Sequence, residues 1–291
     1  MNSLKYIDVH SHIQDKAFEV DREAVLARMR EEGIGALVVG TDRKMSEDAI
    51  RLAEQYEFLW ATVGQHPTDS LKAVCGGEGR ESGINAEFDY DFYLKLAKNP
   101  KVVAIGECGL DYYHEDQNAK RKTQRDLFER HIELSLEIKK PLMLHCRPSP
   151  GTLDAYEDML KILDHRLYGH SDFMDFSASD PRYPGNVHFF AGNWDIAERF
   201  LKKGFTLSFT GVITFARDYD QVIKNTPLEQ LMVETDCPYV APAPFRGKRN
   251  EPRFIKEIAN KIAEIRGEDI AKVAKVTCQN ALRLFTPSVT I

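Results

Sequence analysis

The chain has 291 residues, of which 43% are hydrophobic and 29% charged, and its formal net charge is −6 at pH 7. Such a chain can bury a sizeable core, while the negative charge argues against a general nucleic-acid coat protein but leaves room for a local basic patch. No apolar signal core follows Met1, and the chain has no run of about 18 apolar residues that could span a membrane. We therefore expect a soluble, cytoplasmic protein without a membrane partner.

Short apolar runs alternate with longer helical patterns, which indicates βα units and a parallel sheet. Strands are predicted at residues 6–12, 36–41, 59–66, 102–108, 141–146, 186–190, 205–210 and 231–236. Helices are predicted at residues 21–32, 46–57, 90–98, 117–139, 153–164, 193–203, 251–266 and 269–284. Eight strands, each followed by a helix, predict a TIM (β/α)8 barrel of the α/β class as a single domain over residues 1–291, with a doubly wound open sheet as the alternative.

Two long connections interrupt this pattern. The segment 73–88 follows the third strand, so in a barrel it belongs to the catalytic face as a candidate lid. The segment 165–185 precedes the sixth strand, so we expect it on the opposite face, without substrate contacts.

Paired histidines stand at the end of the first strand, in the run Asp8-Val9-His10-Ser11-His12. Because successive side chains of a strand alternate between faces, His10 and His12 point the same way, about 6 to 7 Å apart along the backbone. Histidine is a common metal ligand, so the pair can supply half of a coordination shell. A solvated strand end is the alternative interpretation of this motif alone.

Four later strands carry one metal-capable side chain each at their carboxyl ends. These residues are Glu107, His145, His188 and Asp236. Any one of them could be a buried side chain satisfied by a hydrogen bond, but in a barrel all five strand ends converge on one mouth.

A divalent metal pair can be divided among these side chains. We expect Glu107 to bridge two ions, because a carboxylate can bind one ion through each oxygen. His10, His12 and Asp236 then hold the first ion, and His145 and His188 hold the second. Few carboxylates face these ions, so the site keeps a positive charge and favours an anionic substrate.

Several motifs occur together in one order along the chain. They are Asp-x-His-x-His at 8–12, Gly-Gln-His-Pro at 64–67, Gly-Glu-Cys-Gly-Leu-Asp-Tyr-Tyr at 106–113, His-Cys-Arg at 145–147, Glu-Thr-Asp-Cys-Pro at 234–238 and Arg-Gly-Lys-Arg-Asn-Glu-Pro at 246–252. In this order the chain resembles the TatD family of metal-dependent deoxyribonucleases over nearly its whole length.

This resemblance implies a TIM barrel and a two-metal phosphodiesterase that acts on DNA, often as an exonuclease, with Mg, Mn or Zn. The implied ligands agree with those inferred from the strand ends. The resemblance also places His66 in the active site, in contact with the phosphate or leaving group; by itself it would be taken for a turn histidine. The family commonly has a small hydroxyl residue after the sixth-strand histidine, whereas this chain has Phe189-Phe190-Ala191, which affects substrate range more than metal binding.

Hydrolysis by metal-activated water is the expected reaction, since coordination lowers the pKa of water from 15.7 to about 7. Asp236 is either a ligand only or also the proton acceptor. Arg147, Arg246 and Lys248 border the expected mouth and are candidates for binding flanking phosphates of a nucleic-acid substrate, most readily DNA. A solvated basic loop is the alternative for them.

Two further carboxylates, Asp8 and Glu234, share the strand parity of His12 and Asp236 and should point into the barrel beneath the metals. There they must orient a ligand or meet an internal cation. Asp111 is placed on the loop after the fourth strand, where packing and substrate contact are equally compatible.

Two other functions remain open from sequence. An amidohydrolase-type hydrolase of cyclic amides or esters could use the same barrel, but many such enzymes bridge their metals with a modified lysine, and the fourth strand has none after Lys101. A non-catalytic metal-stabilised scaffold is the alternative from a different class, and the full ligand set with nearby cations argues against it.

Overall fold

The computed structural model describes residues 4–68, 88–113, 118–168 and 184–286. Its strands are β1 (Tyr6–Ser11), β2 (Ile34–Val39), β3 (Leu59–Val63), β4 (Val102–Asp111), β5 (Leu142–Arg147), β6 (Gly185–Val187), β7 (Thr206–Phe209) and β8 (Leu231–Val233). Its α-helices are α1 (Arg22–Glu32), α2 (Arg43–Gln55), α4 (Tyr90–Ala97), α5 (Asn118–Ile138), α6 (Asp154–Leu163), α7 (Trp194–Lys202), α8 (Asp220–Asn225), α9 (Ile255–Arg266) and α10 (Ile270–Phe285). Both loops expected to be long, 73–88 and 165–185, lie mostly outside the described residues.

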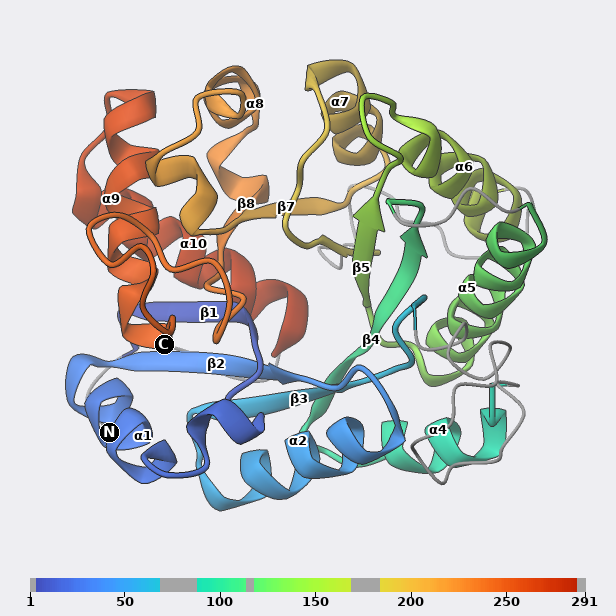
Figure 1. Ribbon diagram of the computed structural model, residues 1–291, viewed down its shortest axis with the longest axis horizontal. Coiled ribbons are helices and arrows are strands. Elements are labelled where there is room, and N and C mark those ends of the chain that lie inside the picture. Colours follow the sequence, from blue (N-terminus) through green and yellow to red (C-terminus); the bar gives the residue numbers. More distant parts are fainter. Residues whose placement is uncertain (1–3, 69–87, 114–117, 169–183, 287–291) are drawn as a thin grey trace.

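The eight strands form one parallel sheet in the order of the sequence, and helices surround it (Figure 1). The first and last strands meet through a parallel bridge between Ser11 and Cys237. Two backbone hydrogen bonds complete this contact, from His12 N–H to Cys237 O at 2.8 Å and from Asp236 N–H to His10 O at 2.9 Å. The sheet is therefore a TIM barrel, and the open doubly wound alternative is excluded.

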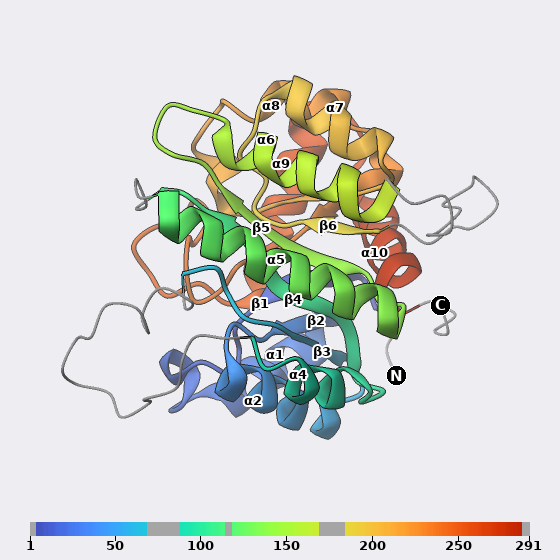
Figure 2. The ribbon, with the colours of Figure 1, turned by 90° about the vertical axis from the view of Figure 1, so that its right-hand side faces the viewer.

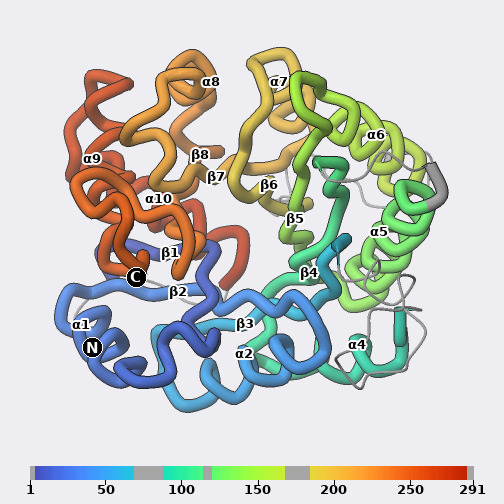
Figure 3. Tube along the Cα trace, in the orientation of Figure 1, coloured from blue at the N-terminus to red at the C-terminus, as the bar shows by residue number. Residues whose placement is uncertain are grey.

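The chain travels once around the barrel, so its first and last strands become neighbours (Figure 3). Side chains that are far apart in sequence are thereby brought to one rim. Helices such as α5 and α6 run beside the strands that they cover (Figure 2). Among the described helices, none combines the length and apolar character needed to cross a membrane.

Most buried apolar side chains belong to one large cluster between the sheet and its helices. Cys108, Cys146 and Cys237 lie in this cluster, and strand alternation predicts this place for Cys108 and Cys146, which lie within β4 and β5. A smaller cluster joins Ile7 and Val9 of β1 to residues of α10, so the last helix covers the first strand.

Helix starts follow the expected capping chemistry. Asp42, Asp89, Asn193 and Asp269 each accept a hydrogen bond from a backbone N–H in the first turn of the helix that follows. The sequence misplaced the ends of several strands, because β6 and β8 stop before His188 and Glu234. The backbone there leaves the extended region, with φ of 46° at Phe189 and 54° at Asp236.

Candidate metal centre

The first part of the site joins the two ends of the chain. His10 Nε2 lies 3.8 Å and His12 Nε2 3.5 Å from Oδ1 of Asp236, which follows β8. His12 Nδ1 is 3.0 Å from the carbonyl oxygen of Val39, so this nitrogen donates and Nε2 is left with its lone pair toward the site. The barrel closure between β1 and β8 thus places three ligand atoms around one point.

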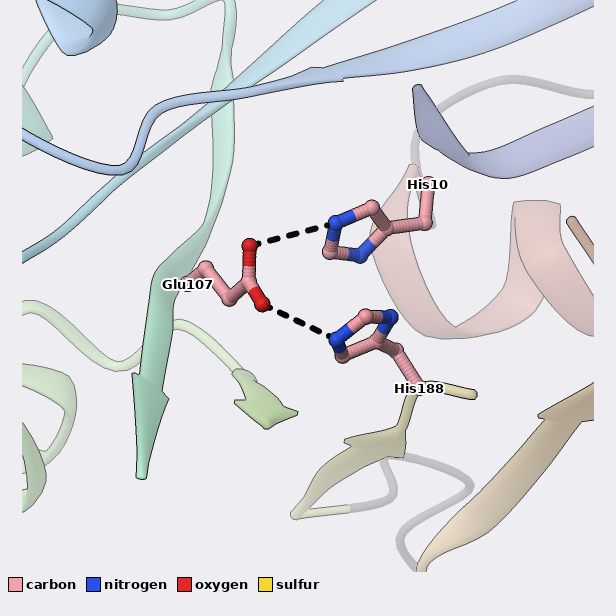
Figure 4. Close-up of side chains that lie close together, drawn as sticks. All are labelled: His10, Glu107 and His188. Carbon is pink, nitrogen blue, oxygen red and sulfur yellow. Dashed lines mark ion pairs between the residues drawn. The ribbon is translucent and has the colours of Figure 1, made fainter. Parts of the chain in front are cut away.

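Glu107 stands at the centre of the cluster and reaches both of its sides. Its Oε2 lies 3.3 Å from His10 Nε2, while Oε1 lies 2.9 Å from Nε2 of His188 (Figure 4). Oε1 is also 2.9 Å from Nδ1 of His145 and 3.4 Å from Nε2 of His66. The two carboxylate oxygens therefore face different sets of imidazoles.

Asp111 belongs to the cluster. The prediction that it lies on a loop after the fourth strand is wrong. The fourth strand continues through Asp111, whose Oδ2 lies 3.1 Å from Nε2 of His145. Gln124 of α5 fixes this position, because its side chain accepts from Asp111 N–H and donates to Asp111 O, each at 2.8 Å. Asp111 shares strand parity with Glu107, and this was the signal in the sequence that could have revealed it.

One buried carboxylate, Glu234, lies beside the candidate ligand His188. Glu234 Oε1 accepts from Phe189 N–H at 2.5 Å and lies 3.5 Å from His188 Nδ1, and its Oε2 accepts from Ser208 at 2.6 Å. Glu234 therefore lies within ion-pair distance of the His188 ring, although His188 Nδ1 makes no hydrogen bond among the described residues. The sequence reading missed Ser208, a buried polar residue on β7.

Asp8 is tied to the residue between Glu234 and Asp236 rather than to a ligand ring. It accepts hydrogen bonds from the N–H of Thr235, at 2.8 Å, and from its hydroxyl group, at 2.5 Å. Complete burial raises the pKa of Asp8 to about 8, although these hydrogen bonds oppose the shift. In the described part of the chain no cation meets Asp8, so the expected internal cation is not found.

Burial and the neighbouring charges have opposite effects on the pKa of the central carboxylate, Glu107. Burial by itself raises the pKa of Glu107, but the charges of His188, His66 and His10 hold it well below its usual range. Burial and repulsion from His188 lower the pKa of His10. For His188, burial is outweighed by Glu107 and Glu234, which raise its pKa well above the usual value. The cluster thus combines ionised oxygen ligands with imidazole nitrogens.

These residues fit a divalent metal. Three groups have ligand atoms within 4.8 Å of one another: His10, Glu107 and His188; His10, His12 and Asp236; and His66, Asp111 and His145. Both ring nitrogens of His10 are buried and make no hydrogen bond among the described residues, although Nε2 lies within ion-pair distance of Glu107 and Asp236. A buried unpaired nitrogen is costly in a metal-free protein, and a metal ion would satisfy it.

A second buried histidine supports the loop that carries His66. His66 follows Gln65, whose N–H donates to Nε2 of His131 at 2.9 Å. His66 itself is anchored by its N–H to Thr41 O, at 2.7 Å, and by its Nδ1, 2.8 Å from the hydroxyl group of Thr68. The structure thus brings His66 into the cluster beside Glu107 and His145.

The predicted phosphate-binding residues are exposed side chains. Arg147 ends β5 and lies over the ring of Tyr113, while Arg246 lies over Phe215. Lys248 is exposed on the same loop as Arg246. Arg249 is different, because it is paired with Asp21 through two hydrogen bonds of 2.7 and 2.6 Å.

Lys101 bears on the amidohydrolase alternative. Its Nζ donates to the carbonyl oxygens of Tyr56 and Leu59, at 2.8 and 3.0 Å, beside the amino end of β4. It therefore lies at the far end of that strand from Glu107. Within the described chain, the fourth strand offers no lysine to bridge metals.

Comparisons with known proteins agree with this geometry. The family model described as TatD related DNase matches residues 7–286. The chain is 35% identical over 281 residues to a Bacillus subtilis protein named uncharacterized metal-dependent hydrolase YabD, with 96% of this chain and 98% of the relative covered. It is 30% identical over 287 residues to the Escherichia coli protein named 3'-5' ssDNA/RNA exonuclease TatD, with the same coverage. The crystal structure of YJJV, a TatD homolog from Escherichia coli, superposes with a TM-score of 0.79 at 26% identity and covers 97% of this chain and 98% of its own.

Proposed function

The chain belongs to the family of TatD-related DNases, and from this membership we propose that it is a metal-dependent hydrolase that cuts phosphodiester bonds in nucleic acids. The observation that carries the proposal is the position of Glu107, whose two oxygens face imidazoles on opposite sides. A carboxylate in this position is suited to hold two divalent ions close together.

The ligands divide between two ions in our proposal. His10, His12 and Asp236 hold the first, His145 and His188 the second, and Glu107 bridges them. The group of His10, His12 and Asp236 supports the first set. The second set is supported by Oε1 of Glu107, which lies 2.9 Å from both His145 Nδ1 and His188 Nε2, although His188 is also grouped with His10. Asp111 and His66 are grouped with His145 and would lie beside the second ion. Zn, Mg and Mn are the candidate metals, since imidazole and carboxylate ligands accept all three.

The residues of the chain then have separate roles. Bound divalent ions lower the pKa of water and neutralise charge on the phosphate. Oδ1 of Asp236 faces His10 and His12, so its other oxygen is our candidate acceptor for the proton of the attacking water. His66 contacts the phosphate or the leaving group.

In our proposal, exposed cationic side chains bind the parts of the substrate that lie outside the reacting phosphate. Arg147, Arg246 and Lys248 bind flanking phosphates, because guanidinium groups match phosphate geometry and lysine adds a point charge. We propose cleavage from one end, in keeping with the word exonuclease in the name of the Escherichia coli relative, and DNA as the principal substrate, where that name includes both single-stranded DNA and RNA. The described cysteines are free and buried, which suits a reducing compartment such as the cytoplasm.

Metal-free protein incubated with end-labelled single-stranded DNA, duplex DNA and RNA, and then supplied with Mg, Mn or Zn, tests this proposal. We expect cleavage only after metal is added, and loss of both cleavage and bound metal in Glu107→Ala. The matched control is Glu54→Ala, because Glu54 is an exposed carboxylate on α2 that pairs with Asn99. Undiminished cleavage and metal content in Glu107→Ala would overturn the two-metal assignment, and absence of cleavage with every metal would overturn the nuclease function.

A further inference from the structure

We propose that three exposed aromatic side chains, Tyr113, Phe215 and Tyr239, form a base-stacking platform for a single strand of nucleic acid around the metal centre. This inference rests on the proposed function, because it assigns the binding of the strand that the metal centre would cut. These three residues together form the aromatic platform.

The exposure of the three rings is unusual for the described chain. Tyr113 is 41%, Phe215 39% and Tyr239 56% exposed, and the only other large hydrophobic side chains exposed to this degree among described residues are Val20 and Ile270. All three rings follow the carboxyl ends of strands, after β4, β7 and β8 respectively. This is the end of the barrel at which the candidate ligands gather.

The aromatic platform is built directly onto the site. Tyr113 N–H donates to Oδ1 of Asp111 at 3.0 Å. Tyr239 N–H donates to Asp236 O at 3.0 Å, and its ring centre lies 6.3 Å from that of His12. The backbone that carries two of the rings is therefore held by Asp111 and Asp236, which border the proposed metals.

The third ring is fixed by contact between neighbouring loops. Thr214 precedes Phe215 and accepts a hydrogen bond of 2.8 Å from the N–H of Ala243, which joins the loop after β7 to the loop after β8. Arg246 of the second loop places its guanidinium carbon 4.0 Å from the centre of the Phe215 ring. The ring and the cation thus lie together on a joined surface.

Cations beside the rings identify the kind of ligand. Arg147 lies 3.7 Å from the centre of the Tyr113 ring, which gives a second arginine–aromatic pair like that of Phe215 and Arg246. A guanidinium group over a ring keeps its N–H edge available for phosphate, while bases stack on rings and on guanidinium planes. A nucleic-acid strand, in which each nucleotide carries a phosphate and a planar base, matches both features.

This chemistry favours single strands over duplexes. Bases of a duplex are paired and stacked inside the helix, whereas bases of a single strand can turn outward and stack on side chains. Stacking tolerates any base sequence, because each base has a π-face. DNA and RNA share this feature, so the aromatic platform by itself does not distinguish the two sugars.

An abasic strand provides the matched ligand for a test, because it keeps the phosphates but has no bases to stack. We would measure binding by fluorescence anisotropy, and KM for cleavage, with base-containing DNA, base-containing RNA and abasic DNA of equal length. The variants are Tyr113→Leu, Phe215→Leu and Tyr239→Leu, each beside an aromatic exchange, Tyr113→Phe, Phe215→Tyr and Tyr239→Phe. Ile270→Ala is the control for loss of an exposed apolar side chain, since it begins α10 rather than following a strand.

Each leucine variant is expected to bind base-containing strands about 5- to 150-fold more weakly, which is the loss of one stacked base. Affinity for the abasic strand should change little, so the ratio of the affinity for base-containing DNA to that for abasic DNA should fall. The aromatic exchanges should keep this ratio at the wild-type value. Equal weakening for both kinds of strand, or no weakening for either, would overturn the aromatic platform. A wild-type protein that binds bases through these rings but cuts nothing would contradict the proposed function and leave the aromatic platform standing.

Discussion

The N–H of Gln65 donates a hydrogen bond of 2.9 Å to Nε2 of His131. Because Nε2 accepts, the proton of the neutral ring is on Nδ1, which donates to Leu127 O at 2.8 Å. Complete burial lowers the pKa of His131 to about 4. The loop before His66 is thus held by a histidine that is neutral in the folded protein.

The burial of neutral His131 predicts that the free energy of unfolding decreases in acid. His131 takes up a proton near pH 6.5 in the unfolded chain but only near pH 4 in the folded protein. Between these values the unfolded state binds more protons, so the free energy of unfolding falls as the pH decreases from about 6.5 to about 4. The shift corresponds to about 3 kcal/mol, which urea unfolding across this pH range would measure.

His131→Gln is the matched variant for this measurement. A glutamine amide can accept from Gln65 and donate to Leu127, but it does not titrate. We expect wild type to lose about 3 kcal/mol more than the variant between pH 6.5 and pH 4. Parallel stability curves for the two proteins would show that His131 is not the titrating group.

Removal of metal should lower the thermal stability of the protein. An ion that binds only the folded state stabilises it by about 2.7 kcal/mol at one hundred times its Kd. We expect a chelator to lower Tm, and Mg, Mn or Zn to restore it. In His10→Ala the metal-dependent part of the shift should shrink; a shift as large as that of wild type would exclude His10 as a ligand.

Glu234→Gln should weaken the centre without removing a proposed ligand. Glu234 lies 3.5 Å from His188 Nδ1 and accepts a hydrogen bond from Ser208. Groups that support a metal ligand in this way typically contribute 10- to 100-fold to metal affinity or activity. We expect a loss of about this size by calorimetric metal titration. Ser208→Ala should give a smaller loss in the same direction, and wild-type affinity in Glu234→Gln would contradict the supporting role.

The backbone conformation of β4 beside the site requires a glycine at position 109. Its φ is 140°, and a Cβ there would lie 2.0 Å from the carbonyl oxygen of His145. Gly109→Ala should therefore destabilise the protein by about 3 kcal/mol or more, as measured by urea unfolding. Gly151→Ala is the control, because Gly151 also has a positive φ but faces open space; an equal loss in both variants would assign the effect to backbone strain alone.

The alternation of strands and helices was sufficient to predict the barrel, because eight βα units leave few arrangements that bury all the apolar faces. It also predicted which strand ends carry the candidate ligands. Parity within a strand placed Cys108 of β4 and Cys146 of β5 against the helices, as the structure confirms. Cys237 lies in the same cluster, but β8 ends before it, so strand parity is not the reason. These inferences depend on local periodicity, which is present in the sequence itself.

Beyond the end of a strand, the alternation of side chains between the two faces no longer predicts where a side chain points. The sequence misplaced the ends of β6 and β8, because no local pattern marks where these strands stop. It also left Asp111 on a loop, although β4 extends through Asp111 and keeps it in the parity of Glu107. Likewise, the hydrogen bonds of Gln65 to His131 and of Asp8 to Thr235 join residues 66 and 227 positions apart, and no local pattern marks them.

The sequence by itself determined the fold and the kinds of side chain available at the barrel mouth, because periodicity and residue chemistry are local properties. Only the tertiary structure decided which atoms meet. Closure of β1 against β8 sets Asp236 beside His10, and the path of β4 directs one oxygen of Glu107 to each side of the cluster. Those distances are fixed by contacts across the whole chain, so they exist only once the barrel has closed.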